Sequence, residues 1–352
     1  MRAVVGLLLT LFVAVAHAQP EQPKQPKQPE QKDQKFTFTD KAMGTFVTVF
    51  IWGNDGTKAQ TAAADAFREM QRLDAEMTTW TETSEVSKVN AAAGGKPVKV
   101  SDETFTVIAR AQDIAKKSGG VFDITVGSFK GLWKFDQDMD GTLPDPAEVR
   151  KRLALVGYKQ LVLDPKAKTV QLKKKGMSIT LGGIAKGYAV DKCAELLKKA
   201  GFSNFMIQAG GDMYIAGSKG SAPWVVAIRD PRGPADSHFA SAPVSNHSFS
   251  TSGDYERGFV KGDIRYHHIL DPRSGQPAHA SRSVTVRAVD AFTADAWSKV
   301  LFILGYEKSL ALIKREKLKD FEVVWIDAKN EVHMTDAIKA VLRIEKQPTP
   351  GI

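Results

Sequence analysis

Strand-type segments in this sequence come in hairpins, and the hairpins alternate with groups of helix-type segments. An alternating strand pattern over Thr45–Trp52 is followed by helical periodicity over residues 57–79 and 101–119. A third helix is predicted from residue 146 to about residue 157, because Asp145 is a good N-cap and a proline follows it. This order does not repeat the strand–helix unit from which a doubly wound sheet is built.

Later in the chain, paired apolar runs separated by turn residues predict hairpins. They cover residues 161–173, 206–218 together with 224–230, and 323–335. With 352 residues, of which 43% are hydrophobic and 25% are charged, the chain is long enough for one large domain or two modest ones. The sequence therefore predicts an α+β fold with mostly antiparallel sheets and helix pairs.

Residues 1–18 have the pattern of a secretory signal peptide. Arg2 precedes a short apolar run, and the segment ends in the small-residue sequence Ala16-His17-Ala18. A membrane anchor is the alternative, but the run is shorter than the about 20 residues that a spanning helix needs. No cysteine follows the run, which excludes lipid attachment at a new N-terminal cysteine. We expect cleavage before Gln19 and export to the periplasm or cell envelope as a soluble protein.

Residues 19–35 consist almost entirely of proline, glutamine and charged residues, and we expect them to form a solvated tether. The net charge of +9 suits an anionic ligand or an anionic membrane surface. The sequence has no basic stripe with interleaved aromatic residues, so it does not support nucleic-acid binding. The single cysteine, Cys193, excludes an internal disulfide and is expected to pack as a small hydrophobe.

The segment Leu181–Gly201 leads from a predicted strand through Gly182 and Gly183 into a helix. Such a turn lets a ligand approach the backbone, and a helix N-terminus attracts an anion such as phosphate. If only the glycines are considered, a tight turn without a ligand is the better interpretation, because the segment matches neither the G-x-G-x-x-G pattern nor the P-loop pattern. Lys186 favours a ligand, since a cation at a helix N-terminus opposes the helix dipole unless an anion compensates.

His268 is a candidate general base. It precedes the sequence Asp271-Pro272-Arg273 and the turn Ser274-Gly275, so its imidazole is expected at the end of a strand beside a rigid loop. Lone histidines are more often structural, but this location is suitable for accepting a proton.

Short motifs occur in a fixed order along the chain. They are KAMGT (41–45), SEVSKVN (84–90), GGVFDITVG (119–127), LGGIAKGYAVD (181–191), QAGGD (208–212), STSGDY (250–255), HHILDPRSGQP (267–277) and ADAWSK (294–299). In this order they resemble the ApbE family of FAD:protein FMN transferases. One such motif is a weak signal, whereas the set in register is highly specific. The resemblance implies a flavin transferase domain over residues 36–345 and a tail over residues 346–352.

The resemblance implies a periplasmic or surface enzyme that splits FAD, places FMN on a threonine hydroxyl of a partner protein and releases AMP. Acceptors in the family carry an Asp-Gly-x-Thr-type motif, and a redox-complex subunit is an expected acceptor. The implied fold is a tandem of two T-fold-like halves with FAD in the cleft between them. Two alternatives use the same site, namely an FAD pyrophosphatase that gives FMN and AMP, and a non-catalytic FAD-binding protein.

By position, the resemblance also implies roles for individual residues. His268 is implied to be the base for the acceptor hydroxyl, and Gly182 and Lys186 are implied to lie near the pyrophosphate. The residues implied to line the flavin and adenosine pockets are Met43, Trp80, Val121, Phe122 and Asp123, with Ile269 as a further FAD contact. Structural roles in the core or at a helix end fit several of these residues as well.

The predicted helix Thr293–Gly305 is apolar almost throughout, yet it carries Asp295, a carboxylate that is costly to bury without a partner. The resemblance implies a divalent cation held by this carboxylate, by the carbonyl of Ala185 and by a threonine hydroxyl one turn after the aspartate. Oxygen ligands of this kind suit Mg²⁺, which would neutralise charge on the pyrophosphate. Lys299 stands at the threonine position, and Thr180 stands where an aspartate is frequent.

Because an ammonium group only donates hydrogen bonds, Lys299 cannot ligate a metal. Three arrangements are compatible with the sequence. In the first, Lys299 points outwards and Mg²⁺ is bound by Asp295, Ala185 and water. In the second, the ammonium occupies the cation position and pairs with Asp295 at i,i+4. In the third, the site is inactive and the protein only binds FAD.

Overall fold

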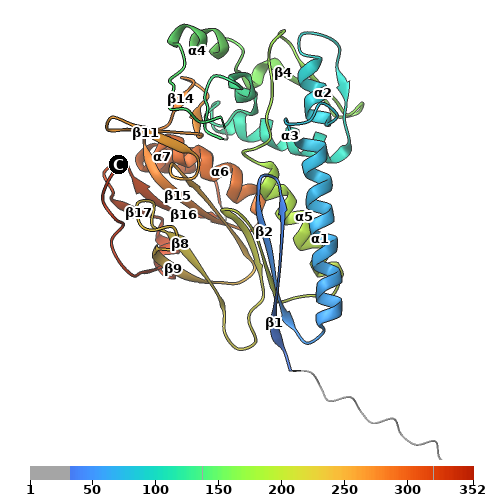
Figure 1. Ribbon diagram of the computed structural model, residues 1–352, viewed down its shortest axis with the longest axis vertical. Coiled ribbons are helices and arrows are strands. Elements are labelled where there is room, and N and C mark those ends of the chain that lie inside the picture. The colour runs from blue at the N-terminus through green and yellow to red at the C-terminus, as the bar shows by residue number, and fades with distance from the viewer. Residues whose placement is uncertain (1–31, 137, 320) are drawn as a thin grey trace, which may run out of the picture. The chain divides into compact units, whose positions relative to one another are not determined.

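The computed structural model describes residues 32–136, 138–319 and 321–352 (Figure 1). The predicted signal peptide and residues 19–31 of the predicted tether lie outside these ranges. The tether ends earlier than expected, because Gln34 and Lys35 already belong to β1 (Gln34–Ala42), which pairs with β2 (Thr45–Gly53). Composition misses these two residues because β1 is an edge strand whose side chains are mostly exposed and polar.

The largest sheet in the described part of the chain is antiparallel, with the strand order β1-β2-β6-β7-β10-β15-β16-β17. Its remaining strands are β6 (Phe205–Ala209), β7 (Asp212–Ala216), β10 (His247–Gly253), β15 (Ser281–Ala288), β16 (Phe321–Asp327) and β17 (Val332–Met334). β6 with β7, and β16 with β17, are hairpins that the sequence predicts. The α+β class with antiparallel sheets is therefore confirmed.

Smaller sheets accompany this central sheet. One has the order β3-β5-β4, another the order β18-β9-β8, and the pairs β11–β12 and β13–β14 are separate hairpins. Their strands are β3 (Val98–Lys99), β4 (Leu161–Asp164), β5 (Thr169–Leu172), β8 (Trp224–Arg229), β9 (His238–Val244), β11 (Gly258–Lys261), β12 (Ile264–His267), β13 (Leu270–Asp271), β14 (Gln276–Pro277) and β18 (Arg343–Ile344). The expected grouping of residues 224–230 with the β6–β7 hairpin is wrong, because β8 pairs with β9.

The helices are α1 (Gly56–Met77), α2 (Glu85–Ala91), α3 (Asp102–Lys117), α4 (Pro146–Leu153), α5 (Ala185–Lys199), α6 (Ala291–Leu304), α7 (Tyr306–Arg315) and α8 (Asp336–Lys339), with 3-10 turns at Ile124–Phe129 and Tyr158–Gln160. The predicted N-cap of α4 is confirmed, since the Asp145 side chain accepts from the N–H of Ala147, but α4 ends at Leu153 instead of near residue 157. No described helix combines the length and apolar character that crossing a membrane requires.

α5 and α6 lie side by side on the central sheet (Figure 1). α6 packs on β10 and β15 and also on α5, which explains why it is apolar almost throughout. A Cβ atom on Gly187 would lie 2.4 Å from the carbonyl oxygen of Ala291 and 2.7 Å from Cβ of Asp295. Glycine is therefore needed at this point for α5 to approach α6, and the approach occurs at the buried Asp295.

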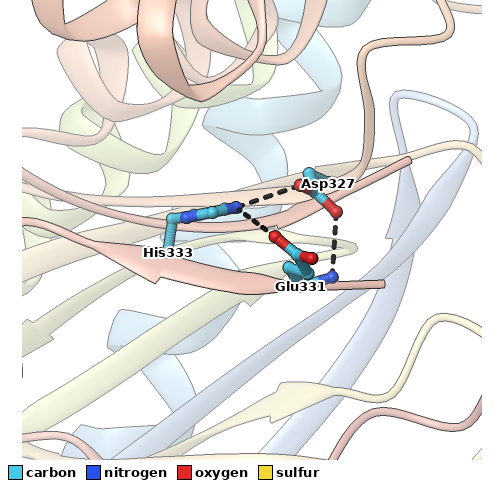
Figure 2. A group of neighbouring side chains, drawn as sticks. All are labelled: Asp327, Glu331 and His333. Carbon is cyan, nitrogen blue, oxygen red and sulfur yellow. Dashed lines mark hydrogen bonds and ion pairs between the residues drawn. The ribbon is translucent and has the colours of Figure 1, made fainter. Parts of the chain in front are cut away.

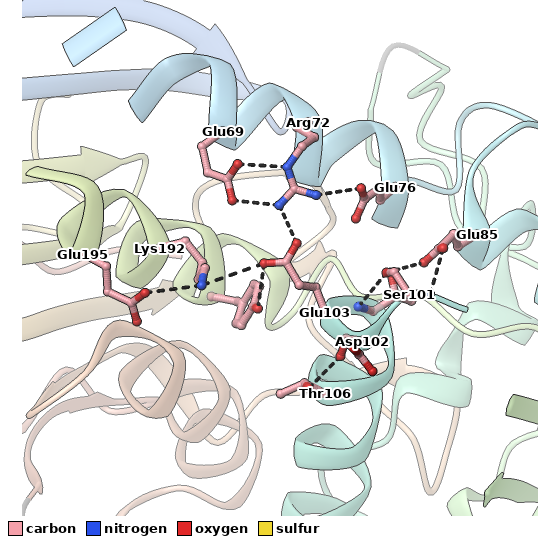
Figure 3. A network of polar contacts seen from close by, with 12 residues as sticks. Glu69, Arg72, Glu76, Glu85, Ser101, Asp102, Glu103, Thr106, Lys192 and Glu195 are labelled. Carbon is pink, nitrogen blue, oxygen red and sulfur yellow. Dashed lines mark hydrogen bonds and ion pairs between the residues drawn. The ribbon is translucent and has the colours of Figure 1, made fainter. Parts of the chain in front are cut away.

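A polar network holds α1, α3 and α5 together (Figure 3). The guanidinium of Arg72 on α1 donates to Glu69 at 2.8 Å and to Glu76 at 2.7 Å, and it also bonds Glu103 at the start of α3. Glu103 in turn accepts from the hydroxyl of Tyr188 on α5 at 3.3 Å. Single exposed ion pairs contribute little to stability, but this network fixes which faces of the three helices meet. Nearby, Cys193 is buried and its Sγ lies 3.1 Å from the carbonyl oxygen of Ala66, so the packing prediction is confirmed.

Residues 346–352, expected as a tail, pack onto the domain. Lys346 Nζ lies 2.9 Å from the buried carboxylate of Asp230, and the Thr349 hydroxyl donates to the same carboxylate at 2.7 Å. The side-chain amide of Asn330 donates to the carbonyl of Pro348 at 2.8 Å. The predicted tail is thus held against the domain, because the buried Asp230 takes partners from this segment that no local pattern reveals.

Candidate active site

Asp191, on α5, fixes the start of α6. Its carboxylate oxygens accept from the backbone N–H of Ala291 at 2.7 Å and from that of Phe292 at 2.9 Å. Both groups belong to the first turn of α6, where backbone N–H groups have no partner within the helix. Burial raises the pKa of Asp191 to about 7 in spite of these bonds. These two hydrogen bonds from Asp191 set the register of α6 against α5, and thereby the position of Asp295.

Two lysines and two aspartates meet at the N-terminal half of α5, and we call Lys186, Asp212, Asp295 and Lys299 the lysine–aspartate cluster. Lys186 Nζ donates to Oδ2 of Asp212 at 2.6 Å. Lys299 Nζ pairs with Oδ1 of Asp295, one turn earlier on α6. Oδ2 of Asp295 accepts from the backbone N–H of Gly187 at 2.9 Å. Since Asp212 is 2% exposed and Asp295 is 0% exposed, each buried carboxylate has a matching ammonium group.

The two carboxylates of the cluster are shifted in opposite directions. Burial raises the pKa of Asp295, the nearby Asp212 adds to the rise, and Lys299 and Lys186 oppose it. Burial acts on Asp212 as well, but the charges of Lys186 and Lys299 outweigh it and lower its pKa. Because both lysines act on both carboxylates, the four charges behave as one electrostatic unit.

Serine hydroxyls from β10 and α6 extend this cluster. Ser250 donates to Oδ1 of Asp212 at 2.5 Å, and Ser298 donates to the backbone carbonyl of Asp295 at 2.8 Å. The hydroxyls of Ser252 and Ser298 lie 2.7 Å apart. Sequence patterns alone assign no role to Asp212 or to these serines. The signal was present, because Asp212 ends the QAGGD motif and Ser250 begins STSGDY.

His268 follows β12 and is half-buried. Its Nδ1 lies 3.4 Å from the carbonyl oxygen of Arg257, so the proton of the neutral ring belongs on Nδ1 and Nε2 is left as an acceptor. Burial, together with the charge of Arg257, lowers the pKa of His268 to about 3, and the charge of Lys299 contributes. His268 is therefore neutral, as a base must be, and it is electrostatically coupled to the cluster. The adjacent His267 is structural, with Nε2 lying 2.6 Å from the carbonyl oxygen of Ala278.

Phe122 and Lys299 flank the turn that precedes α5. A Cβ atom on Gly183 would lie 3.5 Å from the Phe122 ring and 4.0 Å from Cε of Lys299. Gly182, the other glycine of the turn, is exposed. The structure thus brings Phe122 and the two glycines together with the cluster, at the N-terminus of a helix that carries Lys186 in its first turn.

Met43 and Trp80 lie on other segments. Met43 occupies the β1–β2 turn with a φ of 50°, a conformation that is uncommon for a residue with a side chain, and its N–H donates to Asp74 at 2.8 Å. Trp80 is 76% exposed, and Nζ of Lys130 stands 5.5 Å from the centre of its ring. Within the described residues, no hydrogen bond or ion pair links Met43 or Trp80 to the cluster.

Val121, Asp123 and Ile269 are buried. One carboxylate oxygen of Asp123 accepts from both the N–H and the hydroxyl of Thr125, at 2.8 and 2.6 Å. The other oxygen accepts from the N–H of Tyr158 at 2.6 Å. Both oxygens of the Asp123 carboxylate thus have partners within the fold, and they tie the loop that follows Phe122 to Thr125 and Tyr158.

The donor set beside Asp295 does not fit a divalent cation. One carboxylate oxygen of Asp295 bonds the Lys299 ammonium, whose positive charge would repel a divalent cation there, and the other oxygen accepts from the Gly187 amide. No threonine hydroxyl is present at the i+4 position, and Ala185 is buried as the first residue of α5. The arrangement in which Lys299 points outwards is wrong for this structure, because the ammonium pairs with Asp295.

A second group of possible metal ligands, Asp327, Glu331 and His333, lies at the β16–β17 hairpin (Figure 2). One oxygen of Asp327 accepts from the N–H of Lys329 at 2.9 Å and from that of Glu331 at 2.8 Å. The other oxygen lies 3.0 Å from Nε2 of His333, whose ring stacks on Tyr306 with centroids 4.3 Å apart. These contacts engage both oxygens of Asp327 in closing the hairpin, so we assign the group a structural role.

Comparison with known proteins gives consistent results. The ApbE family matches residues 43–325. An FAD:protein FMN transferase of Klebsiella pneumoniae (strain 342) is 30% identical over 298 residues, which cover 84% of this chain and 90% of that protein. One from Treponema pallidum (strain Nichols) is 32% identical, with 80% of this chain and 82% of that protein covered.

Solved structures with the same fold include the following two. The crystal structure of the ApbE protein from Thermotoga maritima is similar with a TM-score of 0.80 and 32% identity, covering 88% of this chain and 100% of that one. The flavin transferase ApbE from Vibrio cholerae has a TM-score of 0.78 and 25% identity, with the same coverage of both chains.

Proposed function

The chain belongs to the ApbE family, and from this membership we propose that it is an FAD:protein FMN transferase. The relatives that carry this name are similar over most of both chains. The observation that supports the proposal within the molecule is the grouping of Lys186 and Lys299 with the Gly182–Gly183 turn at the start of α5. Ammonium groups and a helix N-terminus both attract a pyrophosphate.

The reaction we propose replaces the phosphoanhydride bond of FAD by a phosphate ester. The threonine oxygen of the acceptor attacks the phosphorus of the FMN half of FAD, the bond to the AMP half breaks, and AMP leaves. Nε2 of His268 takes the proton of the hydroxyl. The lysine–aspartate cluster holds the pyrophosphate, and the exposed ring of Trp80 offers an aromatic face to the flavin or the adenine, whereas Phe122 is buried in the core.

Hydrolysis of FAD and FAD binding without chemistry use the same site, but the names of the relatives support transfer to a protein. The divalent cation expected from the resemblance has no part in this proposal, because Lys299 is bonded to Asp295. For the partner, we propose a protein with an Asp-Gly-x-Thr-type motif, such as a redox-complex subunit. We also propose export, supported by the pattern of residues 1–18. Sequencing of the protein from the cell envelope should then find Gln19 at its N-terminus, and an intact Met1 would contradict export.

Transfer can be tested with purified protein, FAD and an acceptor peptide that contains the Asp-Gly-x-Thr motif. We expect the peptide to gain the mass of FMN less one water and AMP to appear in equal amount. A peptide with alanine in place of the threonine is the matched control and should remain unmodified. Release of free FMN with both peptides would instead indicate a pyrophosphatase. Unchanged FAD in all mixtures would indicate a binding protein.

A further inference from the structure

The position of Lys299 supports an inference about how FAD is held, which rests on the proposed function in so far as FAD is the ligand. The ammonium of Lys299 bonds a carboxylate that is 0% exposed, while its own side chain is 18% exposed. The Lys299 side chain is therefore partly open to solvent. Its Cε would lie 4.0 Å from a Cβ atom placed on Gly183, in the turn before α5.

Two cationic side chains consequently reach the same short segment of backbone. Lys186 lies in the first turn of α5 and Lys299 approaches the turn from α6. Their aspartate partners hold them in place, so little side-chain freedom remains to be lost when a ligand binds. An ammonium group has three N–H donors, and pairing with one carboxylate oxygen leaves Lys299 with donors for another acceptor.

We propose that the Lys299 ammonium takes the place of a divalent cation in binding the pyrophosphate of FAD, so that this chain binds FAD without a metal. Asp295, which a metal would need as a ligand, here positions the lysine through the i,i+4 pair. The substitution exchanges two positive charges for one. Lys186 and the positive end of the α5 helix dipole supply the remaining attraction for the two phosphate charges.

Mn²⁺ alone, followed by its electron paramagnetic resonance signal, tests the first half of this inference without any enzymatic reaction. We expect wild-type protein to bind no Mn²⁺ at millimolar concentration. Lys299→Thr restores the missing hydroxyl and frees one oxygen of Asp295, and it should bind Mn²⁺ about tenfold more tightly or better. Lys314→Thr, at an exposed lysine of α7, is the matched control and should behave as wild type. Binding of Mn²⁺ by the wild type that Asp295→Asn abolishes would overturn the inference.

FAD binding, followed by flavin fluorescence, tests the second half. We expect the affinity of the wild type to be the same in EDTA and in Mg²⁺. Lys299→Met should weaken FAD binding roughly 10- to 100-fold in both, the equivalent of one hydrogen bond to a charged group. The Lys299→Thr protein should bind FAD weakly in EDTA and should regain FAD affinity in Mg²⁺. A wild type that needs Mg²⁺ to bind FAD, or a Lys299→Met protein with unchanged affinity, would contradict the proposal.

Removing Lys299 leaves Asp295 buried without its partner, so the variants need a check on folding. The double variant Asp295→Asn/Lys299→Met removes both charges and should unfold at a similar denaturant concentration to the wild type, while still binding FAD weakly. Full FAD affinity in the double variant would overturn the role of Lys299. Neither the Mn²⁺ nor the FAD measurement depends on transfer, so failure of the transfer assay alone would count against the proposed function and not against this inference.

Discussion

Replacing His268 with alanine is expected to leave FAD binding intact and to slow FMN transfer by about 10²- to 10⁴-fold, the usual contribution of a general base. The geometry supports this role because Nδ1 faces the carbonyl of Arg257 and Nε2 is left as an acceptor. The neighbouring His267 cannot substitute, since it is buried and bonded to Ala278. The measurement is the transfer rate to the acceptor peptide at saturating FAD.

The pH dependence provides a second test of the same residue. Because burial and Arg257 lower the pKa of His268 to about 3, the ring stays neutral from pH 8 down to pH 5. The kcat/KM profile of the wild type, which reports the free enzyme, should therefore lack the fall near pH 6.5 that an ordinary histidine base produces. A fall at that pH which disappears in the His268 variant would show that the free enzyme holds a normal, protonatable imidazole.

A structural role of His268 must be distinguished from a catalytic one. His247→Ala, at a histidine that bonds the carbonyl of Ser245, is the matched control and should keep full activity. Imidazole added to the His268→Ala protein should restore part of the transfer rate if only the base is missing. Equal activity of His268→Ala and the wild type would sink the assignment, as would a variant that has lost FAD binding together with transfer.

The elements of the fold were predictable wherever local pattern decides structure. The N-cap at Asp145 and the hairpins at 161–173 and 323–335 follow from residues close together in sequence. The predictions were wrong or incomplete where contacts between distant residues determine the structure. β1 is a strand because it pairs with β2, and β8 pairs with β9 instead of with the β6–β7 hairpin. Residues after 345 are held by Asp230, which is distant in sequence.

The site shows the same division. Asp295 could be recognised from sequence as a buried carboxylate that needs a partner, and Lys299 as a residue incompatible with a metal. The QAGGD motif marks Asp212, but its role could not be assigned from sequence, because that role depends on β7 placing Asp212 against Lys186, and no linear pattern records this contact. Asp191 was missed for a similar reason, since it caps a helix that begins about 100 residues later.

Lys186→Met is expected to lower the free energy of unfolding by about 3–5 kcal/mol, the typical effect of breaking a buried ion pair from one side. Lys186 Nζ lies 2.6 Å from Asp212, whose side chain is 3% exposed. Without this lysine the carboxylate keeps only the Ser250 hydroxyl and the more distant charge of Lys299. The measurement is urea unfolding at pH 7, with Lys314→Met as a control that removes an exposed lysine.

The loss of unfolding free energy in Lys186→Met should depend on pH, and the protonation of Asp212 sets the direction of this dependence. In the wild type, Lys186 and Lys299 lower the pKa of Asp212 although burial raises it. Without Lys186, the effect of burial dominates, so the pKa of Asp212 in the folded state rises above the ordinary value of about 3.9. With a raised folded-state pKa, the free-energy cost of burying the ionised Asp212 is complete above that pKa. This cost is absent below the pKa of Asp212 in the unfolded state, because the carboxyl is then protonated in both states. The stability difference between variant and wild type should therefore shrink as the pH falls towards 4.

The double variant Lys186→Met/Asp212→Asn separates the ion pair from the ligand site. Because it leaves no unpaired charge, it should recover most of the stability lost by the single variant, and its unfolding free energy relative to the wild type should no longer change with pH in this range. FAD affinity should stay low in both variants, since each lacks the ammonium that faces the pyrophosphate. If the double variant is as unstable as the single one, the lost stability comes from packing of the lysine stem. If it binds FAD as the wild type does, Lys186 serves the fold alone, and the attraction for phosphate at this turn must come from Lys299 and the α5 helix dipole.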